Sequence, residues 1–130
     1  MDIREYDIKA LAYIGDAVYE VYVRKHIMEN SHEQVNKLHK KAIKYVSAKA
    51  QAHIIQVLEN KFTQAEQAIF KRGRNAVSNT VPKNTDVITY KIATGFEAVI
   101  GYLYLNNETE RLDCILKESI DIIEGKKEEM

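Results

Sequence analysis

Two apolar segments, residues 10–23 and 92–105, most constrain the fold that this chain can adopt. Their apolar residues recur at helical spacing rather than in strict alternation. The whole chain of 130 residues contains one proline and five glycines, so little interrupts helices elsewhere. The sequence therefore predicts an all-α domain in which both segments are buried helices.

A carboxylate interrupts each apolar segment. Asp16 lies in the first, one helical turn before Glu20, and Glu97 is the only charged residue of the second. An ionised carboxylate that is buried without a partner costs roughly several kcal/mol. The residues alone leave two interpretations open. Either Asp16 and Glu97 share a divalent cation, or each pairs with a buried lysine, arginine or tyrosine hydroxyl. We expect Glu20 to be exposed.

Glycines accompany both acids: Gly15 precedes Asp16, and Gly95 and Gly101 flank Glu97. A glycine inside a helix costs about 0.5–1 kcal/mol relative to alanine, and close helix packing is the ordinary reason to keep one. Close approach at these glycines would also bring the two acids together, where they repel each other unless a cation intervenes. Carboxylate oxygens suit Mg²⁺, for which Mn²⁺ can substitute.

Spacing and capping residues predict the other elements. The first expected helix covers residues 5–28. The second is opened by Ser31, and its expected inward residues are Val35, Leu38, Ala42, Ile43 and Val46. The third is capped by Ser47 and ends near Leu58, and the fourth is opened by a capping box at Thr63 and Glu66 and ends at Gly73. After a loop, the last two are a helix capped by Asn84 or Thr85 that ends near Leu105, and a helix over 108–124. Residues 1–125 then form one domain, and 126–130 a frayed tail.

Net charge gives no indication of a polyanionic partner, because 19 Lys and Arg balance 19 Asp and Glu. A local indication lies between residues 71 and 85, where basic side chains mix with hydroxyl and amide groups that suit phosphate oxygens and sugar hydroxyls. The candidate contacts are Lys71, Arg72, Arg74, Asn75, Ser78, Thr80, Lys83, Asn84 and Thr85. The alternative is an ordinary solvated loop after a helix C-terminus.

The single cysteine, Cys114, excludes an intrachain disulfide and suits a reducing cytoplasm. On the last helix it is expected to be a small buried hydrophobic residue. Tyrosines gather on the two helices that carry the acids, where they suit a core or a subunit interface. These tyrosines are Tyr13, Tyr19, Tyr22, Tyr90, Tyr102 and Tyr104.

Six stretches of the chain carry a resemblance to a known family. They are residues 11–24, 38–41, 46–51, 71–76, 82–87 and 96–103. In these stretches the chain resembles the catalytic domain of ribonuclease III. More narrowly, it resembles the mini-ribonuclease III group, which lacks the double-stranded RNA-binding domain. The resemblance implies an all-α homodimer, with one catalytic centre per subunit beside a cleft for double-stranded RNA.

The resemblance also implies an endoribonuclease in which Asp16 and Glu97 hold Mg²⁺ and the basic loop contacts RNA. Hydrolysis would leave 5′-phosphate and 3′-hydroxyl ends, and the implied substrate is precursor 23S ribosomal RNA. Ala12 and Thr94 stand where full-length enzymes carry further acids. This thinner acidic set leaves an alternative, a ribonuclease III fold that binds structured RNA without cutting it. An α-helical nucleotide pyrophosphatase fits less well, because neither apolar segment contains a Glu-x-x-Glu pair.

Overall fold

The computed structural model describes residues 2–76, 81, 83 and 86–126. Its elements are η1 (Ile3–Glu5), α1 (Ile8–Glu29), α2 (Val35–Val46), α3 (Ala48–Leu58), η2 (Glu59–Lys61), α4 (Gln64–Arg74), α5 (Val87–Leu105) and α6 (Thr109–Glu124). These ranges contain no strand, so the predicted all-α fold is confirmed. None of the helices described is long and apolar enough to cross a membrane.

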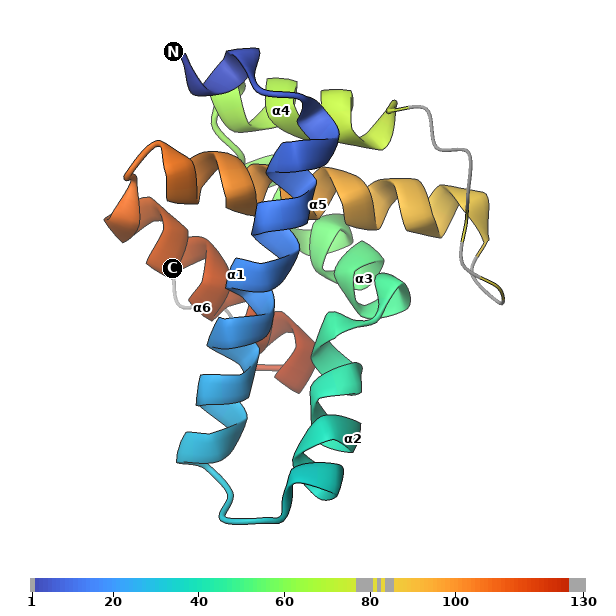
Figure 1. Ribbon diagram of the computed structural model, residues 1–130, viewed down its shortest axis with the longest axis vertical. Helices are drawn as coiled ribbons and strands as arrows, with labels where there is room; N and C mark the ends of the chain where they lie inside the picture. Colours follow the sequence, from blue (N-terminus) through green and yellow to red (C-terminus); the bar gives the residue numbers. More distant parts are fainter. Residues whose placement is uncertain (1, 77–80, 82, 84–85, 127–130) are drawn as a thin grey trace.

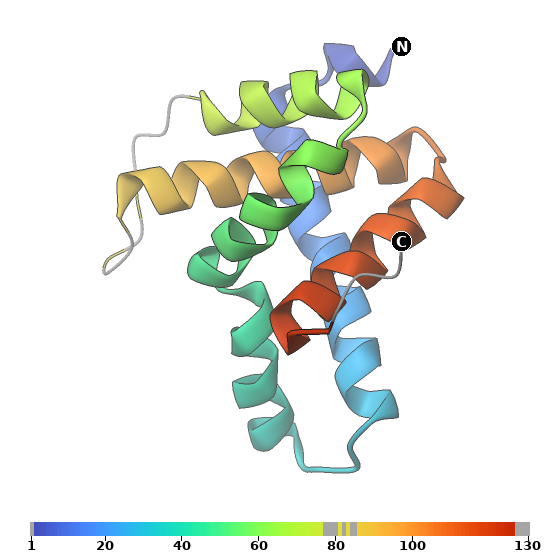
Figure 2. The ribbon, with the colours of Figure 1, turned by 180° about the vertical axis from the view of Figure 1, so that it is seen from behind.

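The crossing of α1 and α5 forms the centre of the fold (Figures 1 and 2). Glycines let the two backbones touch there. A Cβ at Gly15 would overlap the carbonyl of Glu97, and a Cβ at Gly101 would overlap the carbonyl of Leu11. Backbone atoms cannot swing aside as a flexible side chain can, so both positions require glycine. The close helix packing expected from the sequence is confirmed.

A second glycine pair packs α4 against α5. A Cβ at Gly73 would lie 2.8 Å from the Cα atom of Gly95, and a Cβ at Gly95 would lie 2.8 Å from the ring of Phe70. The C-terminal end of α4, which is rich in basic residues, is thereby brought beside the part of α5 that carries Glu97.

Tyrosines divide between the core and the surface. The ring of Tyr19 meets that of Phe96 edge-on at 5.2 Å between centroids, and its hydroxyl donates to the carbonyl of Tyr45 at 2.8 Å. This contact ties α2 to the crossing of α1 and α5. Tyr13, by contrast, is 82% exposed on the outer side of α1.

Two of the predicted helix starts are confirmed and two are wrong. The Ser47 side chain accepts from the backbone N–H of Ala50 at 3.1 Å, and Thr63 and Glu66 form the expected capping box. The next two starts differ from prediction. Helix α2 begins after Gln34 instead of Ser31, and α5 begins after Asp86, whose carboxylate accepts from the N–H of Thr89 at 2.9 Å. A carboxylate at this position is a stronger acceptor than the hydroxyl or amide expected to cap α5.

Three side chains expected to face inward face solvent instead. Val35 is 79% and Ile43 49% exposed, because Ala42 and Tyr45 provide the buried face of α2. Cys114 is also exposed, and its expected burial is wrong. Helix α6 buries the face carried by Leu112, Ile115, Leu116, Ser119 and Ile120, which leaves position 114 on the opposite side.

Candidate active site

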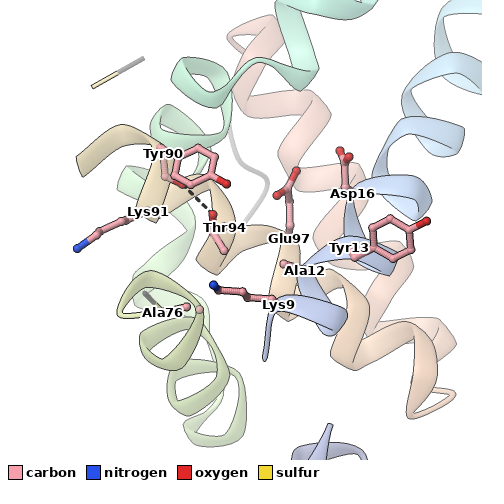
Figure 3. A pocket seen from close by; sticks show the side chains of 10 residues that line it. Lys9, Ala12, Tyr13, Asp16, Ala76, Tyr90, Lys91, Thr94 and Glu97 are labelled. Carbon is pink, nitrogen blue, oxygen red and sulfur yellow. Dashed lines mark hydrogen bonds between the residues drawn. The ribbon is translucent and has the colours of Figure 1, made fainter. Parts of the chain in front are cut away.

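The crossing of α1 and α5 places the two acids side by side. Figure 3 shows the carboxylates of Asp16 and Glu97 pointing in the same direction from their two helices. They line an open pocket of about 440 Å³. The other lining residues are Lys9, Ala12, Tyr13, Gly73, Ala76, Tyr90, Lys91 and Thr94. Residues separated by most of the chain therefore meet at one site.

The two acids differ in their environment. Burial raises the pKa of Glu97 to about 8, and the neighbouring Asp16 carboxylate contributes further through its charge and its contact. Asp16 itself is exposed at the pocket mouth, so its expected burial is wrong. Helix α1 buries the face of Gly15 and Tyr19, and Asp16 lies beside that face. The site thus pairs an exposed acid with one for which ionisation is unfavourable.

Within the described ranges, no lysine, arginine or tyrosine hydroxyl neutralises either acid. Neither Asp16 nor Glu97 takes part in an ion pair there, and the hydrogen bond that Glu97 accepts from Gln51 comes from a neutral amide. Glu20, expected to be exposed, is partly exposed and pairs with Arg24 at 2.9 Å. The interpretation in which each acid is clamped by a buried cation is therefore not what this structure shows.

Gln51 is a site residue that the sequence analysis did not single out. It lies on α3 and is only 1% exposed. Its Nε2 donates to Oε2 of Glu97 at 3.3 Å and to the carbonyl of Val46 at 3.2 Å. An amide on the otherwise apolar inner face of a helix, beside Ala50 and Ile54, was the available indication.

Comparison with known proteins assigns the chain that carries this site to a family. The ribonuclease III domain family matches residues 9–108. The chain belongs to the ribonuclease III family. Proteins named Mini-ribonuclease 3 are similar to it. The protein from Clostridium tetani is 49% identical over 95% of this chain and 82% of its own length. The one from Streptococcus pneumoniae is 49% identical over 89% of this chain and 92% of its own length.

A solved structure agrees with the sequence comparison. The crystal structure of a protein from Fusobacterium nucleatum superposes with a TM-score of 0.83 and is 33% identical, covering 92% of this chain and 96% of that one. Membership of the ribonuclease III family makes this chain an endoribonuclease. The predicted fold and enzyme class are confirmed.

The donor set of the pocket fits a hard cation that keeps most of its own water. In the part of the chain that the structure describes, no group of three or more His, Cys, Asp or Glu side chains could enclose a metal ion. Two carboxylates with vacant lone pairs suit Mg²⁺ or Mn²⁺, whereas Zn²⁺ usually takes three or four protein ligands. Ala12 adds no ligand, and the Thr94 hydroxyl donates to the carbonyl of Tyr90 at 3.0 Å.

The candidate RNA contacts lie at the end of α4. Arg74 stacks over the ring of Phe70 at 5.5 Å, and Asn75 is the C-cap of the helix. Arg72 donates to the carbonyls of Arg4 at 2.9 Å and Tyr6 at 3.4 Å, so its guanidinium also holds the N-terminal segment.

The remaining predicted contacts are less defined. Lys71 and Lys83 are exposed. Ser78, Thr80, Asn84 and Thr85 lie outside the described residues. The structure adds two lysines that the sequence analysis missed, because Lys9 and Lys91 line the same pocket as the acids.

Proposed function

We propose that this endoribonuclease hydrolyses double-stranded RNA with Mg²⁺ held by Asp16 and Glu97, leaving 5′-phosphate and 3′-hydroxyl ends. One observation carries the proposal. Two carboxylates from distant helices share an open pocket, and no described cationic side chain neutralises them. Such a pair is a costly arrangement for a metal-free protein and a favourable one for binding a divalent cation.

Each residue of the pocket has a distinct part in this proposal. Asp16, exposed at the mouth, supplies an oxygen ligand without first having to be uncovered. Glu97 serves as a ligand in its ionised form, and burial beside Asp16, which raises its pKa, opposes that ionisation until a cation binds. Held by Asp16 and Glu97, a bound Mg²⁺ would supply the activation of a water for in-line attack on the phosphodiester and the stabilisation of the leaving oxygen. Lys9 and Lys91 bring positive charge to the same pocket, where they can attract the RNA backbone.

Binding of the duplex is proposed to depend on the surface of this domain. The C-terminal end of α4, which carries Lys71, Arg72 and Arg74, lies beside the pocket, because Gly73 and Ala76 line it. Contacts of lysine and arginine with phosphates hold duplex RNA largely by its shape. A chain with no net charge can therefore bind a polyanion through one local surface.

We propose a homodimer that forms through the outer face of α1. Tyr13, Val21 and Met28 are 82%, 67% and 59% exposed along that face. Large apolar side chains in such a row are typical of a surface that another protein covers. Tyr13 also lines the pocket, so a second copy on this face would lie beside the site and extend the surface offered to a duplex.

Precursor 23S ribosomal RNA is the proposed physiological substrate, in the cytoplasm. This proposal rests on the resemblance of the chain to mini-ribonucleases, which is consistent with its relatives named Mini-ribonuclease 3. The test is whether the purified protein trims the paired ends of a precursor 23S transcript and leaves a mature transcript uncut.

The decisive experiment is incubation of a double-stranded RNA with the protein, with and without Mg²⁺, beside Asp16→Asn. We expect cleavage only for the unmodified protein with Mg²⁺. The Asp16→Asn variant should lose at least about 100-fold in rate while retaining its fold and nearly all of its duplex binding. Binding without cleavage by the unmodified protein would favour the alternative of a non-cutting RNA-binding module. Cleavage by Asp16→Asn at the unmodified rate would refute the assigned site.

A further inference from the structure

Gln51 is a polar side chain buried where an apolar one would pack more favourably. It is 1% exposed on the inner face of α3, next to Ala50 and one turn before Ile54 and Ile55, which are themselves buried. Its Oε1 atom is buried with no hydrogen-bond partner in the described part of the chain. A leucine or methionine would fill a similar volume without leaving such an oxygen. Packing alone therefore does not explain the amide.

The donor end of the amide is fully used. Nε2 has two acceptors: the carbonyl of Val46 at 3.2 Å, and Oε2 of Glu97 at 3.3 Å. Val46 ends α2, and Ser47 caps α3. The backbone carbonyl of Ser47 accepts from the backbone N–H of Gln51 at 3.0 Å. The corner between α2 and α3 thus anchors the amide, and the amide reaches from that corner to α5.

A neutral donor has a specific advantage at this position. A lysine or arginine would hold the Glu97 carboxylate equally well, but it would also neutralise the charge that a divalent cation requires. An amide holds one oxygen and leaves the charge in place. The amide bonds Oε2, so Oε1 of Glu97 is left for the interaction with the neighbouring Asp16 carboxylate.

We propose that Gln51 is a positioning residue, which holds Oε2 of Glu97 so that the Glu97 carboxylate meets Asp16 in an orientation suited to a divalent cation. The inference deepens the proposed function and rests on it. Groups that hydrogen-bond to metal ligands typically change metal affinity or activity by about 10–100-fold when they are removed. The buried, unpartnered Oε1 of Gln51 is then the cost of placing an amide donor at this point.

The test compares Gln51→Leu with a matched control on α4. Gln67 resembles Gln51 in its bonding, because its Nε2 donates to the carbonyl of Glu59 at 2.9 Å and its Oε1 is buried without a partner among the described residues. Gln67 does not line the pocket. Mn²⁺ affinity is measured from the electron paramagnetic resonance signal of free Mn²⁺, and cleavage of a double-stranded RNA is followed as a function of Mn²⁺ concentration.

We expect Gln51→Leu to bind Mn²⁺ about 10-fold or more weakly than the unmodified protein, and to regain cleavage as Mn²⁺ is raised. Its melting temperature without metal should be no lower than that of Gln67→Leu, whose Mn²⁺ affinity should be unchanged. Gln51→Met, which keeps an unbranched side chain, is measured in parallel and decides the result if the leucine variant does not fold.

Two outcomes would overturn the inference, and they are distinguishable. If the unmodified protein binds Mn²⁺ and cleaves RNA, and the folded Gln51 variants match Gln67→Leu in both measurements, then Gln51 has only a packing role. If the unmodified protein neither binds Mn²⁺ nor cleaves RNA, the proposed function fails and this inference fails with it.

Discussion

Gly15 lies directly against the backbone carbonyl of Glu97, so the residue that precedes one acid touches the other acid itself. This contact sets the distance between α1 and α5 at the level of the pocket. It links the packing of the domain to the geometry of its site, because neither backbone can move without moving a carboxylate.

Gly15→Ala should therefore be strongly destabilising. The added Cβ meets the carbonyl of Glu97, which is backbone and cannot rotate away. We expect the free energy of unfolding to fall by about 2–3 kcal/mol, at the upper end for overpacked cores. Urea denaturation followed by circular dichroism measures this. The exposed Ala10 on the same helix provides a control: Ala10→Gly should cost only about 1 kcal/mol of helix propensity. Equal stability of Gly15→Ala and the unmodified protein would contradict the close contact.

Glu97→Gln should stabilise the metal-free protein in a pH-dependent way. Burial and the Asp16 carboxylate raise the pKa of Glu97 from 4.5 to about 8, so ionisation of Glu97 disfavours folding increasingly as the pH rises between these values. The melting temperature of Glu97→Gln should thus match that of the unmodified protein near pH 4 and exceed it at pH 8. A gain of about 1 kcal/mol would appear as about 3–6 °C.

The same pair of proteins tests the link to the cation. Mg²⁺ should raise the melting temperature of the unmodified protein at pH 8, because it binds the ionised pair. Glu97→Gln should respond much less, since it offers one carboxylate. A stability difference between the two proteins that is constant from pH 4 to pH 8 would contradict the raised pKa.

Glu66→Gln should destabilise the fold at neutral pH. Glu66 is 2% exposed, and burial by itself would raise its pKa. The Arg111 guanidinium, at 2.9 Å and 2.8 Å from the two carboxylate oxygens, and the backbone N–H of Thr63 outweigh burial and lower the pKa. The stabilisation that ionised Glu66 contributes is fully present above its ordinary pKa of 4.5. It is lost as the pH falls through the lower pKa that Glu66 has in the folded protein.

The expected loss for Glu66→Gln is about 2–4 kcal/mol at pH 7, because a partly buried arginine is left without its carboxylate. The difference from the unmodified protein should shrink in strong acid. Chemical denaturation at several pH values measures the loss of unfolding free energy at pH 7 and its decrease in acid. Glu33→Gln removes an exposed pair with Lys41 and serves as the control, for which we expect no measurable change at pH 7.

Lys71→Gln and Lys83→Gln should weaken duplex binding without affecting the metal site. Each lysine that contacts a phosphate contributes to the dependence of affinity on salt. The slope of log affinity against log salt concentration should therefore decrease by about one for each substitution. Fluorescence anisotropy with a labelled RNA duplex measures this slope. Lys117→Gln on α6, away from the pocket, should leave it unchanged. A slope that is near zero for the unmodified protein would contradict phosphate contacts altogether.

Val21→Lys should weaken the proposed homodimer. Val21 lies at the middle of the exposed apolar row on α1, where a buried lysine in a subunit interface would be costly. Sedimentation velocity over a range of protein concentrations should show the monomer for this variant and the dimer for the unmodified protein. Val87→Lys changes a residue of similar exposure at the start of α5 and should remain dimeric. If the unmodified protein is also a monomer, the proposed dimer is refuted. If Val87→Lys is as monomeric as Val21→Lys, the interface does not lie on the outer face of α1.

Much of this protein could be predicted because helical periodicity and capping are local. The spacing of apolar residues around Asp16 and Glu97 predicts the two central helices, and the glycines beside these acids predict that the helices approach closely. Local reasoning was weaker at helix ends. Asp86 caps α5 in place of the residues expected, because several neighbouring polar side chains could have served.

The tertiary structure decided which side chains meet, since that depends on the angle and register at which helices cross. It leaves Asp16 exposed, partly buries Glu97, and brings Gln51 from α3 to the second of these acids. Lys91 reaches the pocket for the same reason. A sequence states that a helix has an apolar face and an acid within it. Only the packing of that face against particular neighbours determines whether the acid is solvated, paired, or free to bind a cation.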